Sequence, residues 1–585
     1  MKRISLLILL LSLVCVHAGS AQVKDTTYNA GSKIDTILIS KQQVVNLTVL
    51  GQLWGFLKYH HPEVTGGKYN WDFELFRIIP KVVKAANNIE LSNVLEKWVD
   101  SFGVPPVCAD CNVKETGEVK LKPDYGSLLT NKVLSASLTK KLTYILNNRS
   151  TGPGYYIKMA ENGNPAFLHE LPYSKFIYPD AGYRLLCLYR YWNMINYFYP
   201  YKYLAGENWN NVLADCIPKF ALAANAQDYA LNTLALIARI HDTHANIYGG
   251  NKAIAVFRGK YAAPIQARFI EDKLVVTGYY DTATYIRQLI KPGDIIGRIN
   301  GQKVADLVKK LLPYTPASNY PTQLRDLPRI NLLRSKEMNF ALDITRNGRH
   351  QEVKIAGVSV TKLNNSIDQD PDPKSPGFYL INRNIGYLFP GKYHDKDLHA
   401  IKILFNNTKG IIIDMRCYPS EFMPFSFGPY IKTNNTPFVK FASGSLKQPG
   451  LFTISQPIAI NPGNEYKGKV VVIVNAQSQS QAEYTTMAFQ SSPNVTVIGS
   501  QTAGADGDIS FVTLPGGILS YISGLGVYYP DGTETQRKGV KIDVKIEPTI
   551  AGIKAGKDEL LDKAKAIIMG SRIVRKSVSP EVLKK

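Results

Sequence analysis

The stretch VVVIVNAQSQSQAE, from Val470 to Glu483, combines a buried strand, a polar turn and the start of a helix. Its first five residues are aliphatic, which is typical of a strand that is buried on both faces. Asn475 to Ser480 are small and polar, so we expect the strand to end in an exposed turn, with a helix from Ala482. A serine between a strand and a helix can be presented sharply into a cleft. The amide of the next residue can then stabilise an oxyanion.

This turn also has a structural interpretation, in which Ser480 only caps the following helix. Both interpretations require the same local pattern of residues. The rest of the chain therefore decides between them, by what it supplies around this serine.

The chain has 585 residues, which predicts several domains, and its apolar content of 45% is ordinary for globular proteins. Residues 1–21 carry Lys2 and Arg3, then an apolar run, then small residues, which is the pattern of a secretory signal peptide. No later apolar run is long enough to span a bilayer. We therefore expect a periplasmic or secreted protein with no integral membrane segment after signal removal.

The formal net charge is +22, and the excess of basic residues is spread along the chain. No basic stretch is interleaved with aromatic residues in the manner of a nucleic-acid-binding module. We expect a solvated basic surface and no nucleic-acid partner.

Cys108 and Cys111 form a single C-x-x-C pair. A zinc site of this kind needs a second pair of ligands, and the chain offers none. We therefore favour a local disulfide, formed in an oxidising compartment.

Two segments of the N-terminal half, about residues 45–103 and 183–241, repeat at a constant offset of 138 residues. Trp54 matches Trp192, for example, and Trp71 matches Trp209. Apolar residues recur in each copy at three- and four-residue spacing, in three runs. This predicts a helical domain over residues 22–250 that contains an internal duplication.

The two copies differ at their ends. The second copy carries His241 and His244 where its last helix stops, in the run Ile240-His241-Asp242-Thr243-His244. A lone histidine is usually structural, but His244 stands in a D-T-H turn ahead of a new domain. We regard His244 as a candidate general base.

Residues 257–356 alternate strand patterns with turns. The run from Pro292 to Val304 reads P-G-D-x-I-x-x-I-N-G-x-x-V, with a tight Asn300-Gly301 turn between two strands. This run resembles the hallmark of a PDZ domain. PDZ domains bind peptide termini by adding a strand to an exposed sheet edge.

Residues 375–575 form the last predicted domain. Buried strands at 410–416, 470–474 and 495–499 alternate with helical patterns at 398–405 and 482–490. Alternation of this kind implies parallel strand pairing and an α/β fold.

Several motifs of this domain resemble the C-terminal processing peptidases, which include the tail-specific and tricorn-type serine proteases. They are N-x-x-S-x-S-x-A-E at 475–483, V-I-G-S-x-T-A-G at 497–504, L-P-G-G at 514–517, Y-Y-P-D-G at 528–532 and the I-I-D-M-R strand end. The resemblance runs from about His241 to the end of the chain. It implies an α/β fold with a crotonase-like ββα core and a PDZ domain, and it does not cover the N-terminal repeat.

The resemblance places the nucleophile on Ser480 and makes Ser478 a turn residue. It implies an oxyanion hole built from the Gln481 amide and an amide around Ser420. The family's N-P-G-G turn is replaced by the run from Cys417 to Ser420, which has no glycine.

The residue expected to act as the general base differs from the commonest family pattern. Tail-specific proteases use a Ser-Lys dyad, but Ala505 stands where the lysine would be. Tricorn-type members use a histidine ahead of the PDZ domain, and His244 fills that place. A third group must orient the imidazole. Glu534 is our candidate, Gln536 is the alternative, and Asp242 ranks lower because it is so near in sequence.

The resulting hypothesis is an exported serine endopeptidase that cuts unfolded or C-terminally exposed polypeptides, bound through their C-terminal end, by a Ser-His acyl-enzyme mechanism. It needs neither a metal nor an organic cofactor. The alternative is a catalytically silent binding protein on the same fold, which holds a peptide or a lipophilic ligand. A fluorophosphonate probe separates the two, because it labels only an activated serine.

Overall fold

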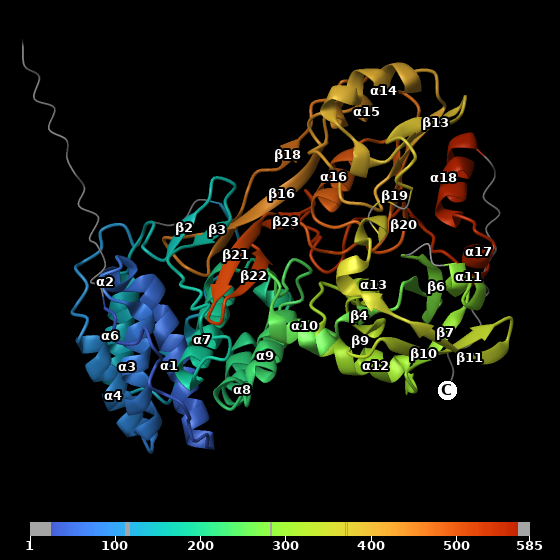
Figure 1. Ribbon diagram of the computed structural model, residues 1–585. Coiled ribbons are helices and arrows are strands. Elements are labelled where there is room, and N and C mark those ends of the chain that lie inside the picture. The colour runs from blue at the N-terminus through green and yellow to red at the C-terminus, as the bar shows by residue number, and fades with distance from the viewer. Residues whose placement is uncertain (1–24, 112–116, 281–283, 369, 371, 571–585) are drawn as a thin grey trace, which may run out of the picture.

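The computed structural model describes residues 25–111, 117–280, 284–368, 370 and 372–570. A helical part, a β-rich middle unit and a mixed α/β part follow one another along the chain (Figure 1). Among the described helices, we find none with the length and apolar character that a membrane crossing requires. The predicted signal peptide lies outside the described residues.

The helical part contains two matching sets of three helices. They are α1 (Lys41–His60), α3 (Trp71–Lys84) and α4 (Asn88–Asp100), then α7 (Ala181–Phe198), α8 (Trp209–Ala221) and α9 (Ala226–Ala238). In the first set, the indoles of Trp54 and Trp71 each donate to the other residue's carbonyl at 3.0 Å. Trp192 and Trp209 exchange the same two bonds at 2.7 and 3.0 Å. The copies found in the sequence therefore make the same contacts.

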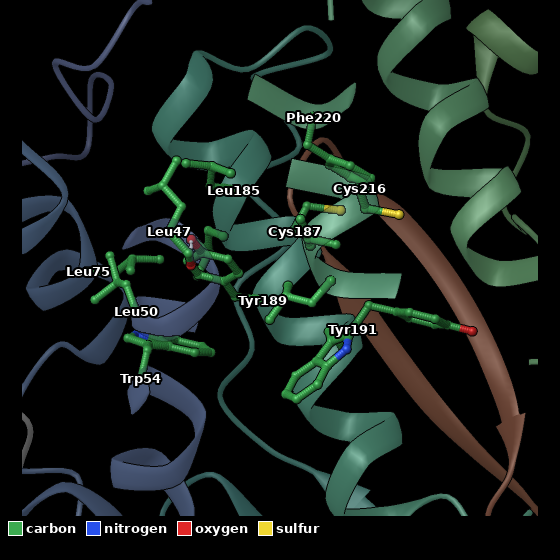
Figure 2. Close-up of a cluster of buried hydrophobic side chains, with 14 of the residues drawn as sticks. Leu47, Leu50, Trp54, Leu75, Leu185, Cys187, Tyr189, Tyr191, Cys216 and Phe220 are labelled. Atoms are coloured by element: carbon green, nitrogen blue, oxygen red, sulfur yellow. Dashed lines mark hydrogen bonds between the residues drawn. The ribbon is translucent and has the colours of Figure 1, made fainter. Parts of the chain in front are cut away.

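A continuous apolar core joins the two sets. Figure 2 shows α1, α7 and α8 contributing side chains such as Trp54, Tyr189 and Phe220. The helices α1 and α7 approach closely at Gly55, where an added Cβ would lie 1.9 Å from the Asn193 side chain. A glycine is therefore required at this crossing. Shorter elements of this part are α2 (Pro62–Thr65), α5 (Gly126–Leu129), α6 (Ala136–Asn147), α10 (Lys252–Arg258), β1 (Glu118–Leu121), β2 (Ile157–Met159) and β3 (Pro165–Phe167).

The middle unit is built on an antiparallel sheet in the order β11-β10-β7-β6-β5, with β8 paired to β7. Asn300 and Gly301 both have positive φ, 49° and 76°, as the predicted two-residue Asn-Gly turn requires. The sheet strands are β5 (Ile265–Ile270), β6 (Lys273–Tyr279), β7 (Ile295–Ile299), β8 (Gln302–Lys303), β10 (Asn339–Arg346) and β11 (Arg349–Ala356). Around them lie α11 (Thr284–Leu289), α12 (Val304–Leu311), α13 (Tyr320–Leu327) and a small sheet of β4 (Tyr261–Ala262), β9 (Arg334–Ser335) and β12 (Val358–Ser359).

The α/β part contains a six-stranded sheet in the order β13-β14-β15-β19-β20-β24. Its strands are β13 (Phe378–Asn382), β14 (Ile385–Leu388), β15 (Gly410–Asp414), β19 (Lys469–Val474), β20 (Val495–Gly499) and β24 (Val544–Lys545). Every pairing from β14 to β24 is parallel, and only β13 runs antiparallel to its neighbour. The predicted α/β class is confirmed.

Helices cover both faces of this sheet. On one face α16 (Gln481–Gln490) packs Ala482, Met487 and Ala488 into the core formed by β15 and β19. On the other face lies α18 (Glu559–Met569), while α14 (Leu398–Phe405) follows β14. Burial on both faces explains the unbroken aliphatic run of β19.

A second sheet and a hairpin connect the α/β part to the helical part. The sheet contains β16 (Pro437–Gly444), β17 (Phe452–Ile454), β18 (Ile458–Ala459) and β23 (Gly526–Tyr528), and β17 also pairs with β1. The hairpin of β21 (Ile509–Leu514) and β22 (Ile518–Ser523) lies against the helical part (Figure 1). Four of its side chains belong to the helical core, namely Val512, Leu514, Ile518 and Ile522.

Candidate active site

Ser480 occupies the turn between β19 and α16. Its φ of 54° and ψ of −118° are rare for a residue other than glycine, and such backbone strain collects at functional sites. The Ser480 amide donates to the Ala505 carbonyl at 3.0 Å and to the Glu483 carboxylate at 3.2 Å. The turn is therefore held in this conformation from two sides.

The buried carboxylate of Glu483 fixes the nucleophile turn to the loop between β20 and β21. Besides the Ser480 amide, it accepts hydrogen bonds from the Thr502 hydroxyl at 2.5 Å and from the amides of Gly504 and Ala505 at 2.7 and 3.0 Å. Burial raises the pKa of Glu483, and these donors oppose that rise. The A-E end of the opening motif thus has a structural role that the sequence alone did not reveal.

His244 follows α9, and both its backbone and its ring are anchored. Its amide donates to Asp242 Oδ1 at 3.0 Å, and its Nδ1 lies 2.9 Å from Ser523 Oγ and 3.5 Å from Asp242 Oδ1. Ser523 in turn donates its amide to Asp242 Oδ2 at 2.6 Å and its hydroxyl to Oδ1 at 3.0 Å. Three residues therefore form one closed network.

This network determines the tautomer of His244. The Ser523 hydroxyl has a single hydrogen, which it gives to Asp242, so its oxygen accepts the hydrogen on Nδ1. Nε2 then carries the lone pair. Nε2 is buried and has no hydrogen-bond partner among the described residues. Its lone pair is therefore free to accept a proton, as a general base must.

Asp242 is fully buried. Burial alone would raise its pKa, but the hydrogen bonds from His244 and Ser523 prevail, and the pKa lies below the ordinary value. Asp242 is therefore a carboxylate, and it can stabilise a positive charge that develops on the His244 ring.

The loop from Ser500 to Asp508 contacts both the serine turn and the histidine turn. Ala505 O accepts from the Ser480 amide, and Ala503 O accepts from the Thr243 hydroxyl at 3.2 Å. The middle unit adds Asn319, whose side-chain amide also donates to Ala503 O at 3.2 Å. The serine turn, the histidine turn and the middle unit, which are far apart in sequence, therefore all bond to this one short loop.

Among the described residues, neither Glu534 nor Gln536 forms a hydrogen bond or an ion pair with the His244 ring. Glu534 bonds instead to Lys120 at 3.5 Å, Tyr203 at 3.4 Å and Lys538 at 3.0 Å. Gln536 directs its amide nitrogen to the His241 carbonyl at 3.3 Å, among other partners. The contacts to His244 come from Asp242, the lower-ranked candidate, and from Ser523, which no pattern in the sequence singles out. Asp242 reaches the ring because the turn folds back on itself, as Asx turns do.

The two backbone amides expected to form the oxyanion hole, those of Gln481 and Ser420, have different surroundings in the structure. The Gln481 amide is at the first position of α16, where helical N–H groups lack a partner within the helix. The Ser420 amide, in contrast, donates to the Pro390 carbonyl at 3.0 Å and is not free. The segment that contains Pro390 and Tyr393 packs against that turn, and an oxyanion donor around Ser420 stays a prediction.

A serine in the turn between a strand and a helix of a parallel α/β sheet is typical of hydrolases. Comparison with known proteins shows which class of hydrolase this part of the chain resembles. Residues 429–546 match the model of peptidase family S41. This match, which covers residues of the α/β part only, supports a serine-type peptidase. No curated protein matches the chain.

Solved structures share the fold at low sequence identity. Mature CPAF complexed with lactacystin gives a TM-score of 0.53 at 14% identity, over 66% of this chain and 98% of that chain. Mature CPAF alone gives 0.52 at 14% identity, over 67% and 98%. A weaker likeness, with a TM-score of 0.38 at 14% identity, is to the photosystem II D1 C-terminal processing protease, over 62% and 93%.

Proposed function

We propose that this peptidase is an exported endopeptidase that hydrolyses polypeptides through an acyl-enzyme on Ser480, with His244 as the base. The observation that carries the proposal is the Asp242–Ser523–His244 network. It leaves Nε2 as the acceptor, and Thr243, between Asp242 and His244, bonds to the loop that also holds the strained Ser480 turn.

In the proposed reaction, Ser480 Oγ attacks the carbonyl carbon of the scissile bond while its proton passes to His244 Nε2. The developing oxyanion lies near the Gln481 amide, at the positive end of α16. As the C–N bond breaks, Nε2 gives the proton to the leaving amine. Water then attacks the ester, with His244 as the base again, and releases Ser480.

Asp242 and Ser523 act through His244 as positioning residues. A carboxylate stabilises the imidazolium that forms when Nε2 takes the proton. Ser523 keeps the hydrogen on Nδ1. Without both, the ring could rotate or present the wrong nitrogen.

The proposed export rests on residues 1–21, and the Cys108–Cys111 disulfide is consistent with an oxidising compartment. We further propose that the middle unit acts as a PDZ domain and that the α/β part is a crotonase-like core. The strand β5 ends the sheet path of the middle unit and offers an edge to which a substrate's C-terminal segment can add.

The alternative is a catalytically silent binding protein, and the occupied Ser420 amide favours it, because an oxyanion hole usually has two donors. A fluorescently labelled unfolded polypeptide tests the two. The wild type should release fragments, and Ser480→Ala, shown to be folded by circular dichroism, should release none. Equal binding by both with no cleavage by either would establish the binding protein.

A further inference from the structure

Aromatic side chains gather on the surface beside the nucleophile turn. Phe422 and Phe425 are each 50% exposed, although large apolar side chains are normally buried. The ring of Tyr484 stacks on Phe422 at 5.6 Å and on Phe441 at 6.1 Å, and Phe425 lies 5.9 Å from Phe422. We call these four residues the aromatic patch.

The aromatic patch is anchored from below. Phe438, which is 1% exposed, contacts Tyr484 edge-on at 5.2 Å and Phe425 at 6.4 Å. The exposed rings are therefore supported by a buried ring and have defined partners. A preformed apolar surface of this kind loses little conformational freedom when a ligand covers it.

The aromatic patch adjoins Ser480 through two hydrogen bonds. Tyr484 stands one helical turn beyond Ser480, and its amide donates to the Ser480 carbonyl at 3.0 Å. The side chain of Gln481 donates to the Glu421 carbonyl at 2.6 Å, directly before Phe422. The patch therefore lies directly beside the nucleophile turn.

On the basis of the proposed function, we infer that the aromatic patch is a substrate subsite for a large apolar or aromatic side chain next to the scissile bond. The patch begins within one helical turn of the nucleophile, so it is near enough to receive the side chain beside the scissile bond of a chain bound at Ser480. Aromatic faces gain from burial and from ring stacking against another apolar side chain. Aromatic faces make no favourable electrostatic interaction with a charged carboxylate.

The test uses two fluorogenic peptides that differ only in having phenylalanine or alanine beside the cleaved bond. The wild type should show a higher kcat/KM for the phenylalanine peptide. In Phe422→Ala and Phe425→Ala, this preference should fall about 10-fold, as expected for the loss of apolar contact in a specificity pocket. The control is Phe511→Ala, an exposed aromatic of β21 outside the patch, whose preference should equal the wild type's.

Fluorophosphonate labelling of the same proteins tests the proposed function separately from the proposed subsite. Labelling of the wild type, with an unchanged preference in the patch variants, would overturn the subsite and leave the proposed function standing. Equal loss of kcat/KM on both peptides would also overturn it, because the effect would then be general. A wild type that neither labels nor cleaves would overturn the proposed function and the subsite together.

Discussion

The nitrogen of His244 that carries the hydrogen decides what the ring can do. In this structure the hydrogen belongs on Nδ1, because Ser523 has already given its own hydrogen to Asp242. The lone pair is left on Nε2, in a buried position. A carboxylate two residues away in sequence and a serine on a distant strand together prepare this state.

Replacement of Asp242 tests that arrangement. Asp242→Asn removes the carboxylate that takes the Ser523 hydrogen and stabilises the imidazolium, so kcat should fall by about 10⁴-fold, the loss that the same change causes in the Ser-His-Asp triad. Glu534→Gln is the control, and it should change kcat little because Glu534 bonds to Lys120 and Lys538. Steady-state hydrolysis of a peptide measures both. A larger loss in Glu534→Gln than in Asp242→Asn would return Glu534 to the site.

Asp506 predicts a pH effect on stability. It is 2% exposed, and burial, then the nearby charge of Glu483, raise its pKa well above 3.8. The folded state therefore holds a proton that the unfolded state releases. This contribution to stability is complete below about pH 4 and is lost as pH rises through the folded pKa, at up to about 1.4 kcal/mol per pH unit.

Urea unfolding between pH 4 and 8 measures this effect. The free energy of unfolding of the wild type should fall as pH rises, and Asp506→Asn should show a shallower fall. Asp531→Asn, at an exposed carboxylate whose pKa is lowered, is the control. Equal slopes in the wild type and Asp506→Asn would contradict the assignment.

At the scale of elements, the strand β19 and its turn were predictable because burial under the helices α16 and α18 leaves no polar position between Val470 and Val474. The position of Ser480 in a turn was predictable as well, because the polar residues of this turn directly follow the aliphatic run of the strand. The partners of His244 were not. Ser523 lies 281 residues from Asp242, and no local pattern in a strand distinguishes a serine that meets a histidine. The bond from the Ser420 amide to the Pro390 carbonyl was not predictable either, because its acceptor belongs to a separate segment.

Ser478 belongs to this scale, because it ties two strand ends together. Its buried hydroxyl donates to the Met415 carbonyl after β15 at 2.7 Å and accepts from the Asn475 amide after β19 at 3.2 Å. Ser478→Ala should lower the free energy of unfolding by about 1–3 kcal/mol, since it leaves buried polar groups without partners. It should still acylate. Urea unfolding measures the change, and an acylation rate as low as that of Ser480→Ala would mean that the motif has been read in the wrong register.

At the scale of the whole molecule, the N-terminal helices are part of the same structural unit as the site. They share a core with the β21–β22 hairpin, which carries Ser523, and the Tyr229 hydroxyl donates to the Pro515 carbonyl at 2.7 Å in its turn. The sequence showed the duplication but not this contact. Helical periodicity identifies a buried face without naming what covers it.

Removal of residues 25–240 should therefore abolish soluble expression rather than leave an active core. The truncation would expose the apolar face of the hairpin and release the anchor of His244. Size-exclusion chromatography of the truncated and full-length chains measures the outcome. A monomeric truncated protein that still cleaves peptide would show that the helices are dispensable.

The most direct test of the central claim is fluorophosphonate labelling followed by peptide mapping with mass spectrometry. We expect one adduct, on the peptide that contains Ser480, in the wild type and in Ser478→Ala. We expect no adduct in Ser480→Ala, and a labelling rate in His244→Ala that is lower by several orders of magnitude, because the nucleophile and its base act as one unit. Labelling of His244→Ala at the wild-type rate, or an adduct on another residue, would contradict the Ser480–His244 assignment.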